Sequence, residues 1–159
     1  MASSTPLRVC VVGAGSISRE FALHHFGRAT RTVVTAVVDL DEARASELAA
    51  DVGSVQAGAS VENVGGSKYR AATTEAKGEP VPYALALSAA LDLCDIVYVG
   101  TTPMAHAPLV LEALAAGKHV LLEKPLAATP ADADAIVDAA EAAAAEQGLH
   151  LGMNIGMRW

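Results

Sequence analysis

The apolar residues of this chain gather in short continuous runs, and the stretches between these runs have helical periodicity. Three of the runs, at 7–12, 33–38 and 95–100, are rich in valine. Runs of this length without polar alternation are typical of parallel strands that are buried on both faces. The pattern therefore predicts an α/β protein in which strands and helices alternate.

The remaining elements follow from the same criteria. They are strands at 118–122 and 149–154 and helices at 16–26, 41–51, 83–91, 106–116 and 129–147. The helix at 129–147 has the best-defined ends, because Thr129, Pro130 and Asp132 form a capping-box start and Gly148 follows the last turn. Right-handed crossovers place the carboxyl ends of all these strands on one edge of the sheet. We therefore predict a Rossmann-type doubly wound parallel sheet, in three α/β/α layers, with five clear strands and one doubtful one.

The stretch 54–82 breaks this pattern, because it is rich in Gly, Ser, Thr and charged residues and has no sustained period. It is predicted to be a loop or an insertion, after a helix that runs to about Asp51, with Gly53 just past its end. A third strand in this stretch must be short, and 60–64 and 67–71 are the only weak places for it. The triplet Lys68, Tyr69 and Arg70 could form a small ligand patch, but a solvated loop tip is the simpler interpretation.

The turn after the first strand contains closely spaced glycines. Gly13 and Gly15 occupy the first two positions of a dinucleotide-binding fingerprint, and Ser18 stands at the third, where its hydroxyl needs a partner. Asp39 ends the second strand, where an acidic residue accepts hydrogen bonds from a ribose. The alternatives are an ordinary turn without a ligand and, for Asp39, a plain helix cap. The fingerprint predicts a cofactor site that also includes Ala14, Ser16 and Ile17.

Composition and net charge exclude several classes of function. The chain has 159 residues, enough for one domain, with 52% hydrophobic but only 4% aromatic residues. A net charge of −7, without clustered Lys and Arg, argues against binding to nucleic acid or to an anionic membrane. Cys10 and Cys94 both lie in or beside predicted strands, where buried reduced thiols are expected, so a cytoplasmic location fits best. No apolar run is long enough for a membrane span, and the histidines have no metal-ligand spacing.

The run from Asp95 to Ala127, DIVYVGTTPMAHAPLVLEALAAGKHVLLEKPLA, carries the most specific pattern in the chain. It resembles the signature of the glucose-fructose oxidoreductase, inositol dehydrogenase and MocA (Gfo/Idh/MocA) family. The opening VVGAGSISREF, the Asp39-Leu40 pair and the terminal GMRW also resemble that family. The resemblance covers nearly the whole chain apart from about 54–80.

The resemblance implies a nicotinamide cofactor, NAD with NADP as the alternative, and hydride transfer at a sugar, polyol or related alcohol. It implies that Lys124 is the catalytic residue, because a cation beside the reacting oxygen stabilises developing alkoxide charge. The cofactor contacts that it adds to those of the glycine loop and Asp39 are Thr101, Thr102, Pro103, His106, Glu123 and Lys124. For His106, an N-terminal helix residue without a catalytic part is an equal alternative.

Members of the family carry a second α/β domain that supplies the substrate pocket. The chain is therefore expected to be a single NAD(P)-binding domain, 1–159, without that C-terminal substrate domain. On this basis it would be incomplete as a catalyst alone. A stand-alone NAD(H)-binding or sensing module is the alternative. The apolar stretch 155–159 would then stay uncovered, which favours self-association or a partner that supplies the missing domain.

Overall fold

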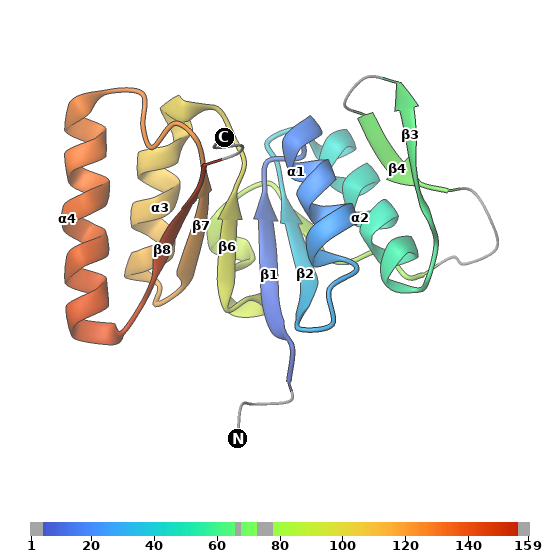
Figure 1. Cartoon of the computed structure of the whole chain (residues 1–159), viewed down its shortest axis with the longest axis horizontal. Coiled ribbons are helices and arrows are strands. Elements are labelled where there is room, and N and C mark those ends of the chain that lie inside the picture. Colours follow the sequence, from blue (N-terminus) through green and yellow to red (C-terminus); the bar gives the residue numbers. More distant parts are fainter. Residues whose placement is uncertain (1–4, 66–67, 73–77, 156–159) are drawn as a thin grey trace.

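The computed structural model describes residues 5–65, 68–72 and 78–155. Within this part of the chain, six parallel strands form the main sheet in the order β5-β2-β1-β6-β7-β8. The strands are β1 (Leu7–Val12), β2 (Thr32–Val38), β5 (Tyr83–Ala84), β6 (Ile96–Val99), β7 (His119–Glu123) and β8 (Leu151–Asn154). The helices are α1 (Ser16–Glu20), continued by a π-helix (Phe21–Phe26), α2 (Glu42–Gln56), α3 (His106–Ala115) and α4 (Pro130–Gln147). The predicted doubly wound α/β fold is confirmed (Figure 1).

Helices cover both faces of the sheet, so β1 is buried on both sides (Figure 1). Val9 and Val11 point into one apolar core, with residues of the π-helix and α2. Cys10 and Val12 point into the other core, with residues of α3 and α4. This double burial explains the continuous apolar run in the sequence. Cys10 and Cys94 are both buried and form no disulfide, as expected.

Local chemistry sets the ends of α4 as predicted. The backbone N–H of Asp132 donates to Thr129 Oγ1 at 3.1 Å, and the Thr129 hydroxyl donates to Asp132 Oδ2 at 2.7 Å. Gly148 follows the helix with φ of 69°, in the left-handed region that favours glycine. None of the described helices has the length and apolarity needed to cross a membrane.

The prediction that the second helix ends at about Asp51, before Gly53, is wrong. Helix α2 continues to Gln56, and Gly53 lies inside its last turns. A Cβ at this position would lie 2.1 Å from the backbone oxygen of Glu79. The glycine therefore allows the segment before β5 to cross close to the helix, where Val81 N–H donates to Ala49 O at 3.2 Å.

The stretch 54–82 is more ordered than predicted. Two of its segments, β3 (Val61–Gly65) and β4 (Lys68–Ala71), form an antiparallel hairpin that lies apart from the main sheet and beside α1 and α2 (Figure 1). Arg70 and Glu62 form an ion pair across it, with Arg70 Nε 2.6 Å from Glu62 Oε1. The two weak strand positions thus pair with each other, and neither of them is the third strand of the main sheet.

The predicted helix at 83–91 is also wrong. Tyr83 and Ala84 form strand β5, which pairs with Val37 and Val38 at the end of β2. Two short 3-10 helices, Leu87–Ala89 and Leu91–Leu93, follow it. The alanine and leucine content of the segment favours a helix locally, but pairing with the free edge of β2 decides the structure.

We predict that Gly53→Ala destabilises the protein by about 1–3 kcal/mol, because the new methyl group overlaps the Glu79 backbone. Alanine by itself would favour a helix interior by about 1 kcal/mol, so a net loss would isolate the backbone contact. Urea denaturation followed by circular dichroism measures the change. Ser46→Ala, on the same helix, is the control and should be close to neutral. Equal or greater stability of Gly53→Ala would contradict the contact.

Candidate functional site

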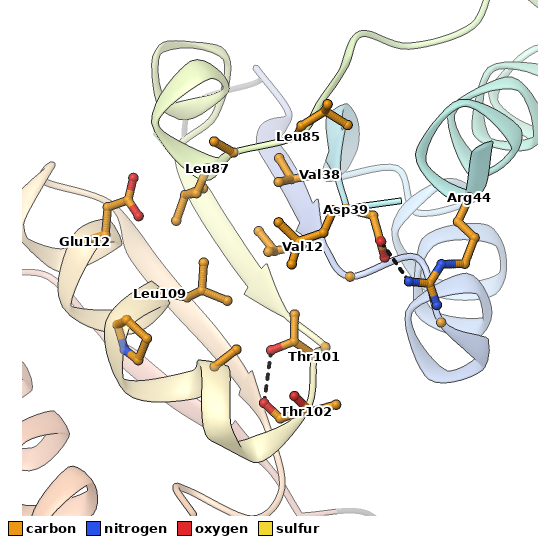
Figure 2. Close-up of a pocket in the computed structure, with 17 residues that line it drawn as sticks. Val12, Val38, Asp39, Arg44, Leu85, Leu87, Thr101, Thr102, Leu109 and Glu112 are labelled. Atoms are coloured by element: carbon orange, nitrogen blue, oxygen red, sulfur yellow. Dashed lines mark hydrogen bonds and ion pairs between the residues drawn. The ribbon is translucent and has the colours of Figure 1, made fainter. Parts of the chain in front are cut away.

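A cleft of about 630 Å³ opens at the carboxyl edge of the sheet, where β1 and β6 lie side by side. Its polar rim includes Gly13, Asp39 and Thr101. Apolar side chains from β1, β2, the segment after β5 and α3 form the floor and walls (Figure 2). Those labelled in the figure are Val12, Val38, Leu85, Leu87 and Leu109. In doubly wound sheets the ligand site lies at this switch point, so the cleft is the candidate site.

The loop after β1 is held very close to the end of β6. Gly13 has φ of 90°, and a Cβ there would lie 2.6 Å from the carbonyl oxygen of Gly100. Its N–H donates to Val38 O at 2.7 Å, which also ties the loop to β2. At Gly15 a Cβ would meet nothing within 4 Å, so the space beside its backbone is open. This is the geometry that a phosphate group needs to approach the backbone closely.

Ser18 replaces the third glycine of the fingerprint, and its hydroxyl has a partner. The side chain is fully buried, and Oγ donates to the carbonyl oxygen of Gly100 at 3.0 Å. A Cβ at Gly100 would lie only 2.2 Å from that Oγ. The serine therefore joins the first turn of α1 to the end of β6, and the third position keeps its packing role.

Asp39 lies at the end of β2 with 9% of its side chain exposed. Its Oδ2 accepts the N–H of Ala14 at 2.7 Å, and Oδ1 accepts the N–H of Asp41 at 2.8 Å. Arg44, on the first turn of α2, places Nη2 3.1 Å from Oδ1 (Figure 2). The helix cap is supplied by Asp41, whose Oδ1 accepts the N–H of Arg44 at 3.1 Å. The carboxylate of Asp39 is thus aimed at the glycine loop rather than used as a cap.

His106 is fully buried and does not line the cleft. Its Nδ1 lies 2.9 Å from Pro125 O, and its Nε2 lies 3.3 Å from Thr101 O. The ring therefore connects the turn after β6 with the turn after β7. Thr101 and Thr102 line the cleft, whereas Pro103 lies behind them at the start of a 3-10 helix.

Glu123, the last residue of β7, and Lys124, which follows it, lie at the carboxyl edge of the sheet. Glu123 is 4% exposed, and its Oε1 accepts hydrogen bonds from Tyr98 Oη at 2.9 Å and Asn154 Nδ2 at 2.6 Å. Burial, with the neighbouring Glu123 carboxylate, raises the pKa of Tyr98, so the phenol remains a donor. Lys124 is exposed, and the bond between it and Pro125 is cis. Neither Glu123 nor Lys124 lines the cleft itself.

A second cavity, of about 510 Å³, lies between the glycine loop, the start of α2 and the hairpin. Ala14, Ser16 and Arg44 line it together with Tyr69 and Arg70. The interpretation of Tyr69 as part of a solvated loop tip is wrong. Its ring packs edge-on against His24, with centroids 4.8 Å apart, and its carbonyl accepts a hydrogen bond from Arg19 at 2.9 Å.

Several residues at the site were not predicted from the sequence. Arg44 borders both cavities, while Leu85 and Leu109 form apolar walls. In the sequence, the signal for such apolar walls is Leu40, an apolar residue directly after Asp39. In the structure, Leu40 borders the cleft and is 90% exposed. Ile17, in contrast, is 39% exposed and is not among the residues that line either cavity.

The donor set of the cleft fits a dinucleotide. Open backbone at Gly15 suits a pyrophosphate, the carboxylate of Asp39 at the rim suits a ribose hydroxyl, and the apolar walls suit an adenine ring. Among the described residues, no group of three or more His, Cys, Asp and Glu side chains could hold a metal ion.

Comparison with known proteins agrees with this geometry. The family of oxidoreductases with an NAD-binding Rossmann fold, Gfo/Idh/MocA, matches residues 7–149. The 1,5-anhydro-D-fructose reductase of Ensifer adhaerens is 34% identical over 148 residues, which are 93% of this chain and 36% of that protein. The chain therefore spans about a third of the length of this relative.

Two solved structures have the same fold as this chain and are also similar to it in sequence. GenD2 from gentamicin A biosynthesis, in complex with NAD, is 28% identical with a TM-score of 0.69, covering 94% of this chain and 34% of that one. KijD10, a 3-ketoreductase from Actinomadura kijaniata in complex with NADP and TDP-benzene, is 28% identical with a TM-score of 0.67, covering 94% and 37%. The chain belongs to the Gfo/Idh/MocA oxidoreductase family and contains its NAD-binding Rossmann domain.

Proposed function

We propose that this chain supplies the cofactor-binding part of an oxidoreductase that transfers hydride between NAD and a sugar, polyol or related alcohol. The observation that carries the proposal is the close packing of the Gly13 loop on Gly100, with the Asp39 carboxylate aimed at the same loop. The names of two relatives fit this class of reaction, since one is a 1,5-anhydro-D-fructose reductase and another is a 3-ketoreductase solved with NADP and TDP-benzene.

The residues of the cleft would bind the cofactor, and Lys124, outside the cleft, would take part in the chemistry. When bound, a nicotinamide supplies or accepts the hydride. The Gly13–Gly15 loop would hold the pyrophosphate, Asp39 the adenosine ribose, and Thr101 and Thr102 the part of the cofactor that crosses β6. Lys124 would place its ammonium group beside the reacting oxygen, where it stabilises negative charge and exchanges a proton.

The exposure of Lys124 supports a division of labour between this domain and a second one. Hydride transfer needs a substrate carbon held about 3–3.5 Å from the nicotinamide, with the reacting orbitals aligned. In the described part of the chain, Lys124 stands outside the cleft, so no walls hold a substrate beside it. We infer that a further substrate domain completes the catalyst. The alternative is a cofactor-binding module without catalysis, in which Lys124 would be exposed as well.

Association and location belong to the same proposal. Ile155 is 62% exposed at the end of the described chain, and the rest of the apolar stretch, 156–159, lies outside the described residues. We propose that this end meets either a substrate domain or a second copy of the chain. The buried, unpaired thiols of Cys10 and Cys94 favour the cytoplasm.

The first functional prediction is that the protein binds NAD more tightly than NADP. The Asp39 carboxylate would repel a 2′-phosphate, and Arg44 is already paired with Asp39 and, at 3.4 Å, with Asp41. Asp39→Ala should weaken NAD binding about tenfold or more, because it removes a charged hydrogen bond worth about 1.5–3 kcal/mol. NADP binding should improve, since Arg44 loses a partner. Isothermal titration calorimetry with each cofactor measures both effects.

The double variant Asp39→Ala, Arg44→Ala is the control for this prediction. It should lose the gain in NADP affinity while NAD binding stays weak, because the free guanidinium is gone. Equal affinity of the wild type for the two cofactors would refute the assigned role of Asp39.

The second functional prediction is that the isolated chain binds cofactor but turns over sugars and polyols very poorly. Orientation of a substrate can contribute about 7–11 kcal/mol to lowering a barrier, and that contribution should be largely missing. NADH fluorescence on addition of protein tests binding, and absorbance of NADH with a panel of sugars tests turnover. A monodisperse monomer with ordinary dehydrogenase rates that Lys124→Ala abolishes would show that one domain suffices.

A further inference from the structure

The carboxylate of Glu123 is buried without an opposite charge. It is 4% exposed at the end of β7, and no Lys, Arg or His among the described residues forms an ion pair with it. Its partners are the hydroxyl of Tyr98 and the amide of Asn154, both neutral donors to Oε1. An ionised carboxylate at this depth is costly unless hydrogen bonds or a cation compensate for it. Here two hydrogen bonds from neutral groups hold the carboxylate in place, and no cation is paired with it.

The two donors come from the strands on either side of Glu123. Asn154 is its direct partner in the ladder between β7 and β8, and Tyr98 lies on β6, the neighbour on the other side (Figure 1). Tyr98 is fully buried, and its ring stacks on Phe21 with centroids 5.2 Å apart. The carboxylate is therefore fixed by packed elements rather than by a mobile surface side chain.

We propose that Glu123, held by Tyr98 and Asn154, makes the site favour the oxidised, positively charged nicotinamide of NAD⁺ over the neutral ring of NADH. This inference rests on the proposed function, because it places the nicotinamide at the carboxyl edge of β6 and β7. NAD⁺ and NADH differ at the nicotinamide ring and share the rest of the molecule. A protein group changes the relative affinity for the two forms only if it interacts differently with the part in which they differ. A fixed negative charge near the ring is an interaction of that kind.

The two acidic residues at the carboxyl edge of the sheet have different partners, and this difference supports the proposal. Asp39, at the adenosine end, has the guanidinium of Arg44 3.1 Å from its Oδ1. Glu123, at the other end, has two neutral donors instead. The carboxylate without an ion-pair partner thus stands at the end of the sheet edge where the nicotinamide ring is expected.

The test compares affinities for NAD⁺ and NADH in the wild-type chain and in Glu123→Gln. The glutamine Oε1 can still accept from Tyr98 and Asn154, so the variant removes the charge and keeps both bonds. Equilibrium titration at low ionic strength gives the ratio of the two Kd values. We expect the ratio to shift about tenfold toward NADH in the variant, the size of effect that a unit charge within about 10 Å has at an effective dielectric constant near 20.

Two control variants separate charge from structure. Tyr98→Phe removes one of the two donors but leaves the carboxylate and its bond to Asn154, so it should lower stability and shift the ratio much less than Glu123→Gln does. Glu141→Gln removes an exposed carboxylate on α4 and should change neither. If Glu123→Gln fails to fold, as judged by circular dichroism, Asn154→Lys takes its place, because a cation beside Glu123 should move the ratio in the same direction.

The outcomes distinguish this inference from the proposed function. An unchanged ratio in Glu123→Gln, with both cofactor forms still bound, would overturn the role of Glu123 and leave the cofactor site intact. A ratio that Tyr98→Phe shifts as much as Glu123→Gln does would also overturn it, since packing would then be the cause. Failure of the wild type to bind either form would refute the proposed function and this inference together.

Discussion

The close approach of two stretches of backbone, at Gly13 and Gly100, is the constraint on which the site depends. A Cβ on Gly13 would lie 2.6 Å from Gly100 O, and a Cβ on Gly100 would lie 2.2 Å from Ser18 Oγ. A side chain at Gly13 would push the loop away from the end of β6, and one at Gly100 would displace the Ser18 hydroxyl at the start of α1. Next to this contact, the N–H of Ala14 lies 2.7 Å from Asp39 Oδ2. The packing of the loop on β6 therefore also sets the position of the loop relative to the Asp39 carboxylate.

Features encoded locally could be predicted from the sequence. Valine runs indicated β1 and β2 because both faces of these strands are largely buried, and burial of both faces favours a nearly continuous apolar run. Thr129 and Asp132 indicated the start of α4 because a cap needs only residues that are neighbours in the chain. The glycine loop and Asp39 could be found for the same reason, since the fingerprint lies within one βαβ unit.

Features decided by distant contacts could not be predicted. Gly53 resembles a helix stop, yet α2 continues through it because Glu79 crosses its surface. The two residues of β5 carry no strand pattern of their own, and only the edge of β2 makes them a strand. Arg44 is an exposed helix residue by sequence, and its place between two cavities follows from the hairpin that faces it. In each case tertiary packing outweighs the local preference.

The position of His106 shows how the fold couples parts of the site that no single element contains. Its ring spans Thr101 O and Pro125 O, so the turn that borders the cleft and the turn that carries Lys124 share one buried side chain. Both carbonyl oxygens can accept a hydrogen bond from the ring. The contact of Nδ1 with Pro125 O, at 2.9 Å, is shorter than that of Nε2 with Thr101 O, at 3.3 Å, so His106 holds the turn of Lys124 more firmly than the turn that borders the cleft.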